Sequence, residues 1–122
     1  MKILLCLTTG ITLALSAFAH EGDKDNLQAG DTQKVTGQVL DLACYVDHGA
    51  AGDKHDGCAR KCIESGLPVG LKADDGKTYL LIGEHAPLNK EVAPHAGEKI
   101  TVAGKIASRD GINMIENAVV QQ

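Results

Sequence analysis

The chain has 122 residues and a formal net charge of −4 at pH 7, with 12 basic and 16 acidic side chains. Nucleic acids and anionic membrane surfaces repel an acidic chain, so neither is an expected partner. Only 2% of the residues are aromatic, too few for a platform on which bases stack. Composition therefore argues against nucleic-acid binding and predicts an aliphatic core.

The first nineteen residues have the order of a secretory signal peptide. Lys2 supplies the positive start, residues 3–15 form an apolar stretch shorter than a membrane span, and residues 17–19 read A-F-A, an A-x-A cleavage site. We expect cleavage before His20 and a periplasmic or secreted protein. No later segment is apolar enough to cross a bilayer, so we expect no membrane span in the mature chain.

Cleavage also changes the cysteine count. Cys6 leaves with the signal peptide, so the four cysteines of the full chain become three in the mature one. An odd number of cysteines in an exported protein leaves one thiol outside any intramolecular disulfide. A framework of two disulfides is therefore excluded for the mature chain.

The mature chain divides into a leader and one domain. Residues 20–33 are acidic, contain Leu27 as their single large apolar side chain, and are expected to be a flexible acidic leader. Residues 34–122 are expected to form a single domain. A domain of this size is near the lower limit for a single hydrophobic core, so a covalent or metal cross-link would stabilise it considerably.

The first half of the domain is expected to hold one strand and one helix. Residues 35–46 suit a long strand, and a one-residue shift in their apolar phase predicts a bulge. Residues 47–57 are rich in Gly and Asp and predict a loop that runs into a helix, with Asp53 as its N-cap. That helix is expected to end near Ser65, because Gly66 and Pro68 follow.

The second half is expected to be mostly strands. Residues 69–72 and 77–82 flank an Asp75-Gly76 step and predict a hairpin. Residues 87–95 predict a short helix or turn, and the segments around 100–106 and 112–120 predict the last two strands. The expected fold is mainly β: a small five-stranded barrel of the oligonucleotide/oligosaccharide-binding (OB) type, with one main helix between strands 1 and 2.

The residues capable of metal or thiol chemistry lie within one short stretch. Cys44-x3-His48 is followed by His55-x2-Cys58-x3-Cys62. On a helix, positions i, i+3 and i+7 share one face, so the spacing places His55, Cys58 and Cys62 together. Cys44, at the expected end of the first strand, is close enough in sequence to join them. Three thiols and an imidazole are the ligands of a four-coordinate Cys3His site.

Three interpretations of this cluster remain open. The first is a soft transition-metal site for zinc or copper, formed by Cys44, Cys58, Cys62 and either His48 or His55. The second is a disulfide from Cys44 to Cys58 or Cys62, which would give a structural or protein-binding module with one spare thiol and another periplasmic protein as its partner. The third is thiol redox chemistry, although C-x3-C is not the C-x-x-C of dithiol oxidoreductases.

Other catalytic arrangements are not apparent in the sequence. Ser65 and Ser108 are expected at a helix end and a turn, without an organised His-acid partner. The glycines punctuate turns and do not form a phosphate-binding loop. We therefore expect a binding protein rather than an enzyme.

The chain resembles a group of small exported bacterial proteins of uncharacterised function. The residues that carry the resemblance are Leu42-Ala43-Cys44-Tyr45, the spacing of Cys58 and Cys62, Gly66-x-Pro68-Val69-Gly70-Leu71, and residues 75–81 with Asp75-Gly76 and Tyr79-Leu80-Leu81. The resemblance implies an OB-like barrel, a bacterial origin and a periplasmic location. It implies no activity and no catalytic residues.

Overall fold

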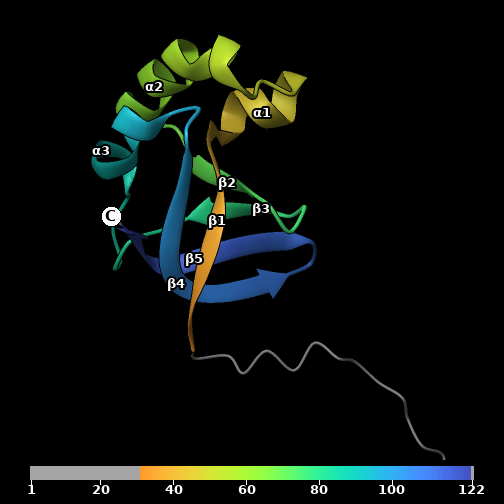
Figure 1. Ribbon diagram of the computed structural model, residues 1–122, viewed down its shortest axis with the longest axis vertical. Helices are drawn as coiled ribbons and strands as arrows, with labels where there is room; N and C mark the ends of the chain where they lie inside the picture. The colour runs from red at the N-terminus through yellow and green to blue at the C-terminus, as the bar shows by residue number, and fades with distance from the viewer. Residues whose placement is uncertain (1–30, 122) are drawn as a thin grey trace, which may run out of the picture.

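The computed structural model describes residues 31–121 and shows a mainly β protein built on one closed barrel (Figure 1). The five strands are β1 (Thr32–Asp41), β2 (Val69–Ala73), β3 (Thr78–Leu81), β4 (Lys99–Arg109) and β5 (Ile112–Gln121). The helices are α1 (Leu42–His48), α2 (Asp56–Glu64) and α3 (Asn89–Val92), with short 3-10 turns at Asp53–His55 and Ala93–His95. The expected five-stranded barrel is confirmed. The signal peptide and the leader up to residue 30 lie outside the described residues.

The strands close into a barrel in the order β1-β2-β3-β5-β4, because β1 pairs with both β2 and β4. Every pairing is antiparallel except that of β3 with β5, which is parallel. β1 begins at Thr32, which pairs with Lys105, so ordered pairing starts two residues before the expected domain start at Lys34. The hairpin of β2 and β3 has the predicted Gly76 at a φ of 86° in its turn.

The expected bulge in the first strand is not found. β1 pairs in continuous register with both neighbours. The register shift in the described sheet lies in the pairing of β4 with β5, between Ala103 and Lys105 of β4, where β5 carries one extra residue. Gly104 lies at this shift, where a Cβ atom would stand 2.5 Å from the side chain of Ile115. The change of apolar phase near Leu42 has another cause, because the strand ends there and α1 begins.

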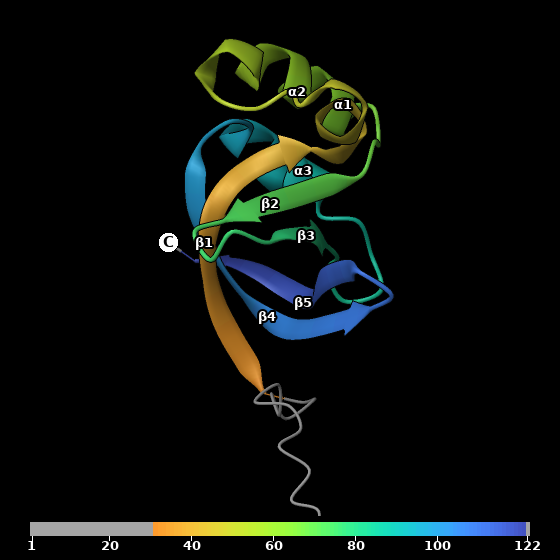
Figure 2. The same ribbon diagram turned by 90° about the vertical axis from the view of Figure 1, so that its right-hand side faces the viewer.

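The core fills the barrel and continues under the helices at one end. Its fully buried side chains come from the strands and from two helices: Val39, Leu71, Val102, Ile115, Ile63 of α2 and Val92 of α3. Figure 2 shows α1 and α2 lying together over this end of the barrel. The sequence predicted one helix between strands 1 and 2, and the structure has two. The three cysteines of the described chain lie on these two helices.

Hydrogen bonds hold this helical end in place. The Asn89 side-chain amide donates to the carbonyl oxygens of Ile63 and Leu67, at 2.8 and 2.7 Å, and so caps the C-terminal end of α2. Arg60 of α2 donates to the Pro94 carbonyl at 2.7 Å. The position of α2 over the barrel is therefore set by bonds from the segment before β4 as well as by burial of Ile63.

Candidate metal centre

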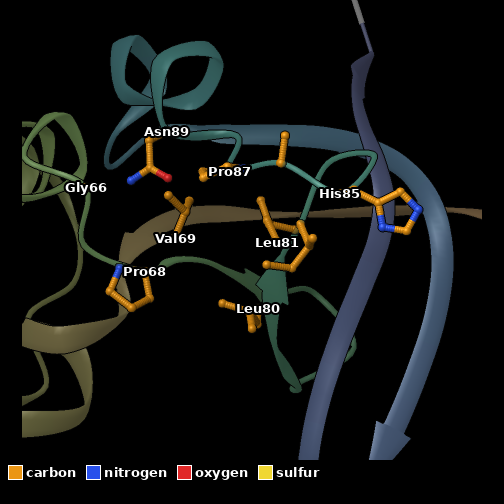
Figure 3. A pocket seen from close by; sticks show the side chains of 10 residues that line it. Gly66, Pro68, Val69, Leu80, Leu81, His85, Pro87 and Asn89 are labelled. Atoms are coloured by element: carbon orange, nitrogen blue, oxygen red, sulfur yellow. The ribbon is translucent and has the colours of Figure 1, made fainter.

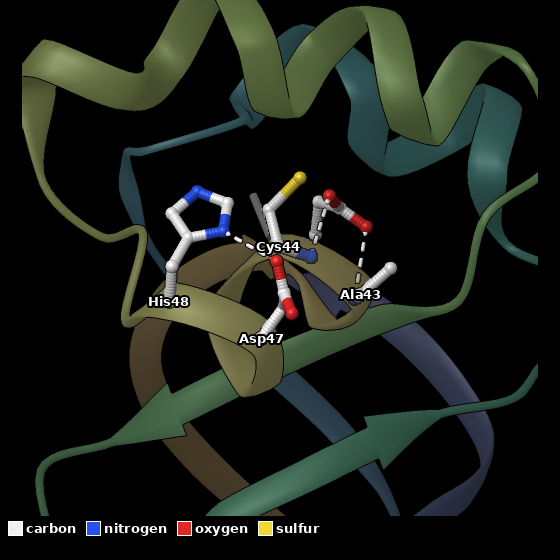
Figure 4. Close-up of polar contacts among 5 residues, drawn as sticks. Ala43, Cys44, Asp47 and His48 are labelled. Atoms are coloured by element: carbon white, nitrogen blue, oxygen red, sulfur yellow. Dashed lines mark hydrogen bonds and ion pairs between the residues drawn. The ribbon is translucent and has the colours of Figure 1, made fainter.

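α1 positions the first cysteine of the predicted cluster. Asp41, the last residue of β1, is the N-cap of α1, and its carboxylate accepts the backbone N–H groups of Ala43 and Cys44 at 3.1 and 3.2 Å. Gly49 ends the helix in the left-handed conformation, with a φ of 73°. Figure 4 shows the sulfur of Cys44 pointing from α1 toward α2.

α2 supplies the other two cysteines. Cys58 and Cys62 are four residues apart on this helix, so their side chains share one face. Cys58 is exposed, while Cys62 and Cys44 are half-buried. The cluster therefore has a covered side, next to the barrel, and an open side at Cys58.

The three sulfur atoms meet between the two helices. The Sγ atoms of Cys44, Cys58 and Cys62 all lie within 4.8 Å of one another. Metal–sulfur bonds of about 2.3 Å in a tetrahedral site place sulfurs about 4 Å apart, so a small inward movement would bring all three onto one ion. A disulfide requires sulfurs about 2 Å apart, and all three cysteines are free thiols. The geometry is that of a three-sulfur group able to hold a metal ion.

The buried carboxylate of Asp41 controls the protonation of this group. Its hydrogen bond with the Cys44 thiol, together with burial and its negative charge, raises the pKa of Cys44 to about 12. Burial raises the pKa of Cys62, and the nearby charges of Asp41 and Cys58 act in the same direction. The thiols of Cys44 and Cys62 therefore keep their protons at neutral pH.

Asp41 itself stays ionised. Burial alone would raise its pKa, but hydrogen bonds from the Cys44 thiol, the N–H groups of Cys44 and Ala43, and the Cys62 thiol outweigh burial and lower the pKa below its ordinary value. Asp41 is only 2% exposed. A negative charge thus lies directly behind two of the three sulfurs.

The two predicted histidines are placed differently. His48, in the last turn of α1, has its Nδ1 atom 3.1 Å from a carboxylate oxygen of Asp47, and Figure 4 shows the ring turned toward Asp47. His55 comes directly before α2, as its N-cap residue, and makes no side-chain capping bond. The group of ligand atoms within 4.8 Å contains the three cysteines and neither histidine.

Two local expectations about this stretch were wrong. Cys44 lies inside α1, not at the end of a strand, because Asp41 caps a helix that starts at Leu42. Asp53 does not cap α2: it begins a separate 3-10 turn, and α2 starts at Asp56. His55 therefore precedes the helix that carries Cys58 and Cys62 and does not share a regular helical face with them.

Sequence reasoning missed Asp41. The available signal was a pair of helix boundaries: Asp41 is a good N-cap residue, Gly49 is a good C-terminal residue, and the seven residues Leu42–His48 lie between them. The β-like alternation of Leu40, Leu42 and Cys44 concealed that signal. Nothing local in the sequence indicates that the carboxylate would be buried against two thiols.

Comparisons with family models, curated proteins and solved structures find no match for this chain. Within residues 31–121, no helix has the length and apolar character needed to span a membrane.

Another candidate binding site is an apolar groove beside β3. It is an open groove of about 450 Å³, lined mainly by apolar residues such as Val69, Leu81 and Pro87 (Figure 3). His85 is the one titratable side chain in its lining. The groove offers apolar contact but no set of converging polar groups, so the thiol cluster is the stronger candidate among the described residues.

Proposed function

We propose that this chain is an exported periplasmic protein that binds one soft transition-metal ion, zinc or copper, through Cys44, Cys58 and Cys62. The observation that carries the proposal is the meeting of three sulfur atoms from two helices within 4.8 Å. Thiolates are the ligands that zinc and copper(I) prefer, whereas calcium and magnesium prefer oxygen ligands. The role is binding, and we assign no catalytic residue.

The three-fold grouping favours metal over the disulfide-stapled module. A structural disulfide needs two cysteines brought to bonding distance and leaves the third free to lie elsewhere. Here all three sulfurs lie within 4.8 Å of one another, and no disulfide joins any two of them. A metal ion accounts for the position of every cysteine, whereas a disulfide accounts for two.

The electrostatics favour metal over thiol redox catalysis. A redox thiol reacts as a thiolate and is found where the surroundings lower its pKa. Asp41 and burial do the reverse, because the pKa values of Cys44 and Cys62 are both raised. A metal ion can overcome this by displacing the protons directly.

We propose that the barrel is OB-like in type. Support comes from its five strands and from a long first strand that pairs with both β2 and β4 to close the sheet. In this arrangement the metal site lies outside the barrel, over one end, on the helices inserted between β1 and β2.

Mass spectrometry of the purified protein tests the metal proposal. Under native conditions we expect the mass of one ion per chain, lost on denaturation to leave three free thiols in the mature chain. A variant with Cys44, Cys58 and Cys62 all changed to Ser should bind no ion. A metal-free chain two hydrogens lighter than its reduced mass would refute the metal proposal and support the disulfide-stapled module.

Location is tested separately. We expect the protein in a periplasmic extract, with an N-terminus at His20. A chain that stays in the cytoplasm with residues 1–19 intact would contradict export and would leave the metal test unaffected.

A further inference from the structure

We propose that the thiol cluster is selective for copper(I), held by three sulfurs, over zinc. This inference rests on the proposed metal-binding function and adds the identity and coordination number of the ion. It follows from the number of donors the fold brings together and from what the neighbouring polar groups already bind.

The donor count is three. Structural zinc sites are almost always four-coordinate, with four protein ligands. Thiolates alone are a preferred set for copper(I), and that ion is stable with three sulfurs in a plane. The group of ligand atoms within 4.8 Å in the described residues contains three sulfurs and no imidazole nitrogen or carboxylate oxygen.

Asp41, the nearest carboxylate, is already engaged. Its Oδ1 and Oδ2 atoms accept the N–H groups of Ala43 and Cys44 at the start of α1. Moving this carboxylate onto an ion would remove the N-cap of the helix that carries Cys44. Asp41 therefore acts behind the sulfurs as a negative charge, which favours any cation, and does not supply a fourth ligand.

None of the nearby histidines joins the three sulfurs. Two of them have a carboxylate partner, and the other precedes α2. The Nδ1 atom of His48 pairs with Asp47, and His55 belongs to the turn before α2. His95 lies on a segment that packs against α2, but its Nδ1 atom is 2.9 Å from a Glu98 carboxylate oxygen. No imidazole in the described chain completes a four-ligand set with the three thiols.

Binding needs no change of oxidation state. Each copper–sulfur bond replaces an S–H bond, the displaced protons pass to solvent, and the copper remains monovalent. Cys58 is exposed, so the ion can enter at this sulfur and then engage the half-buried Cys44 and Cys62.

The test is a competition on the reduced, metal-free protein under anaerobic conditions. Copper(I) is supplied with a chromogenic copper(I) chelator as competitor, with and without an about tenfold molar excess of Zn²⁺. We expect one copper(I) per chain, retained in the presence of zinc. X-ray absorption at the copper edge should show sulfur ligands alone, about three per copper.

Single substitutions identify the ligands. Cys58→Ser changes an exposed side chain and leaves the fold intact, so its expected loss of about tenfold or more in copper(I) affinity reports the ligand itself. His48→Ala and His55→Ala are matched controls and should leave copper(I) affinity unchanged.

The outcomes separate this inference from the proposed function. Displacement of copper(I) by zinc, or a loss of about tenfold in affinity in either histidine variant, would overturn the three-sulfur copper(I) site while metal binding stands. Binding of neither ion would refute both.

Discussion

Two aspartates of this barrel each face an acidic proton donor, with different consequences. Asp75, in the turn between β2 and β3, accepts the Tyr79 hydroxyl at 2.7 Å and the N–H of Lys77 at 2.8 Å. Asp41, at the end of β1, caps α1 and lies beside the thiols of Cys44 and Cys62. Tyr79 and Cys44 both have their pKa raised to about 12.

The difference lies in what surrounds each pair. The Tyr79 hydroxyl keeps its proton and donates its one hydrogen bond to Asp75, so this pair is complete as a structural link within the hairpin. The thiols at Asp41 stand next to a third thiol, on a side open to solvent at Cys58. A carboxylate that accepts a hydrogen bond is therefore not by itself a binding site. The helical end differs because three sulfur atoms lie together there.

The largest expected effect is the difference in the free energy of unfolding that each aspartate contributes. Asp41→Ala removes a buried helix cap and leaves two N–H groups without their acceptor, so the free energy of unfolding should fall by about 2 kcal/mol or more. Asp75→Ala, at an exposed turn, should cost about 1 kcal/mol or less. Urea titrations of both variants measure this, and equal losses would show that the Asp41 cap has no special role.

The next effect concerns thiol reactivity in the metal-free protein. Asp41→Asn keeps the side-chain size and an acceptor oxygen but removes the charge, so the pKa of Cys44 should fall toward its ordinary value. Alkylation of Cys44 at pH 8 should then become faster by about tenfold or more, because only the thiolate reacts. Peptide mapping after timed alkylation follows each cysteine. An unchanged rate at Cys44 would mean that Asp41 does not hold its proton.

The comparison also shows what could be predicted from sequence. The Asp75-Gly76 turn predicted the β2–β3 hairpin because turn chemistry is local, and the alternation around Ile100–Ile106 predicted β4 for the same reason. α1 was missed because alternating apolar residues continue past the end of β1. The local rules for caps favour a helix at Asp41 and those for periodicity favour a strand, and tertiary contacts decide between them.

Those contacts are far apart in sequence. Leu42 packs directly over Gly70 of β2, where no Cβ atom would fit, and its N–H donates to the Pro68 carbonyl at 2.9 Å. Lys72 of β2 lies 5.5 Å from the centre of the Tyr45 ring. The three cysteines could be predicted because they lie within nineteen residues of one another. The burial of Asp41 could not, since it requires α1 and α2 to be docked on the barrel.

A smaller effect appears at high pH and belongs to the Tyr79 pair. Burial, and then the bond to Asp75, raise the pKa of Tyr79, so the folded state favours the neutral phenol. This stabilisation is complete below the ordinary tyrosine pKa of about 10 and is lost as pH rises through about 12, a change on the order of 1 kcal/mol.

Phenolate absorbance measures this titration. Tyr45→Phe leaves Tyr79 as the one tyrosine of the chain, so its titration can be followed without overlap. Tyr79→Phe should remove the high-pH loss of stability. A Tyr79 that titrates near 10 would contradict the buried pair.

The smallest expected effect is the loss of stability at low pH, when Asp75 of the same pair becomes protonated. The hydrogen bond from Tyr79 lowers the pKa of Asp75, so the ionised carboxylate stabilises the fold at pH values above its unfolded pKa of about 3.9, and this contribution is lost as pH falls through the lower folded value. Asp75 is exposed, so solvent screens the effect to about 0.5 kcal/mol. Asp75→Asn should flatten the stability profile between about pH 2 and 4 relative to the unmodified chain. If the profile keeps its slope in this variant, the acid dependence comes from another carboxylate, and Asp41, whose pKa is also lowered, is the one to change next.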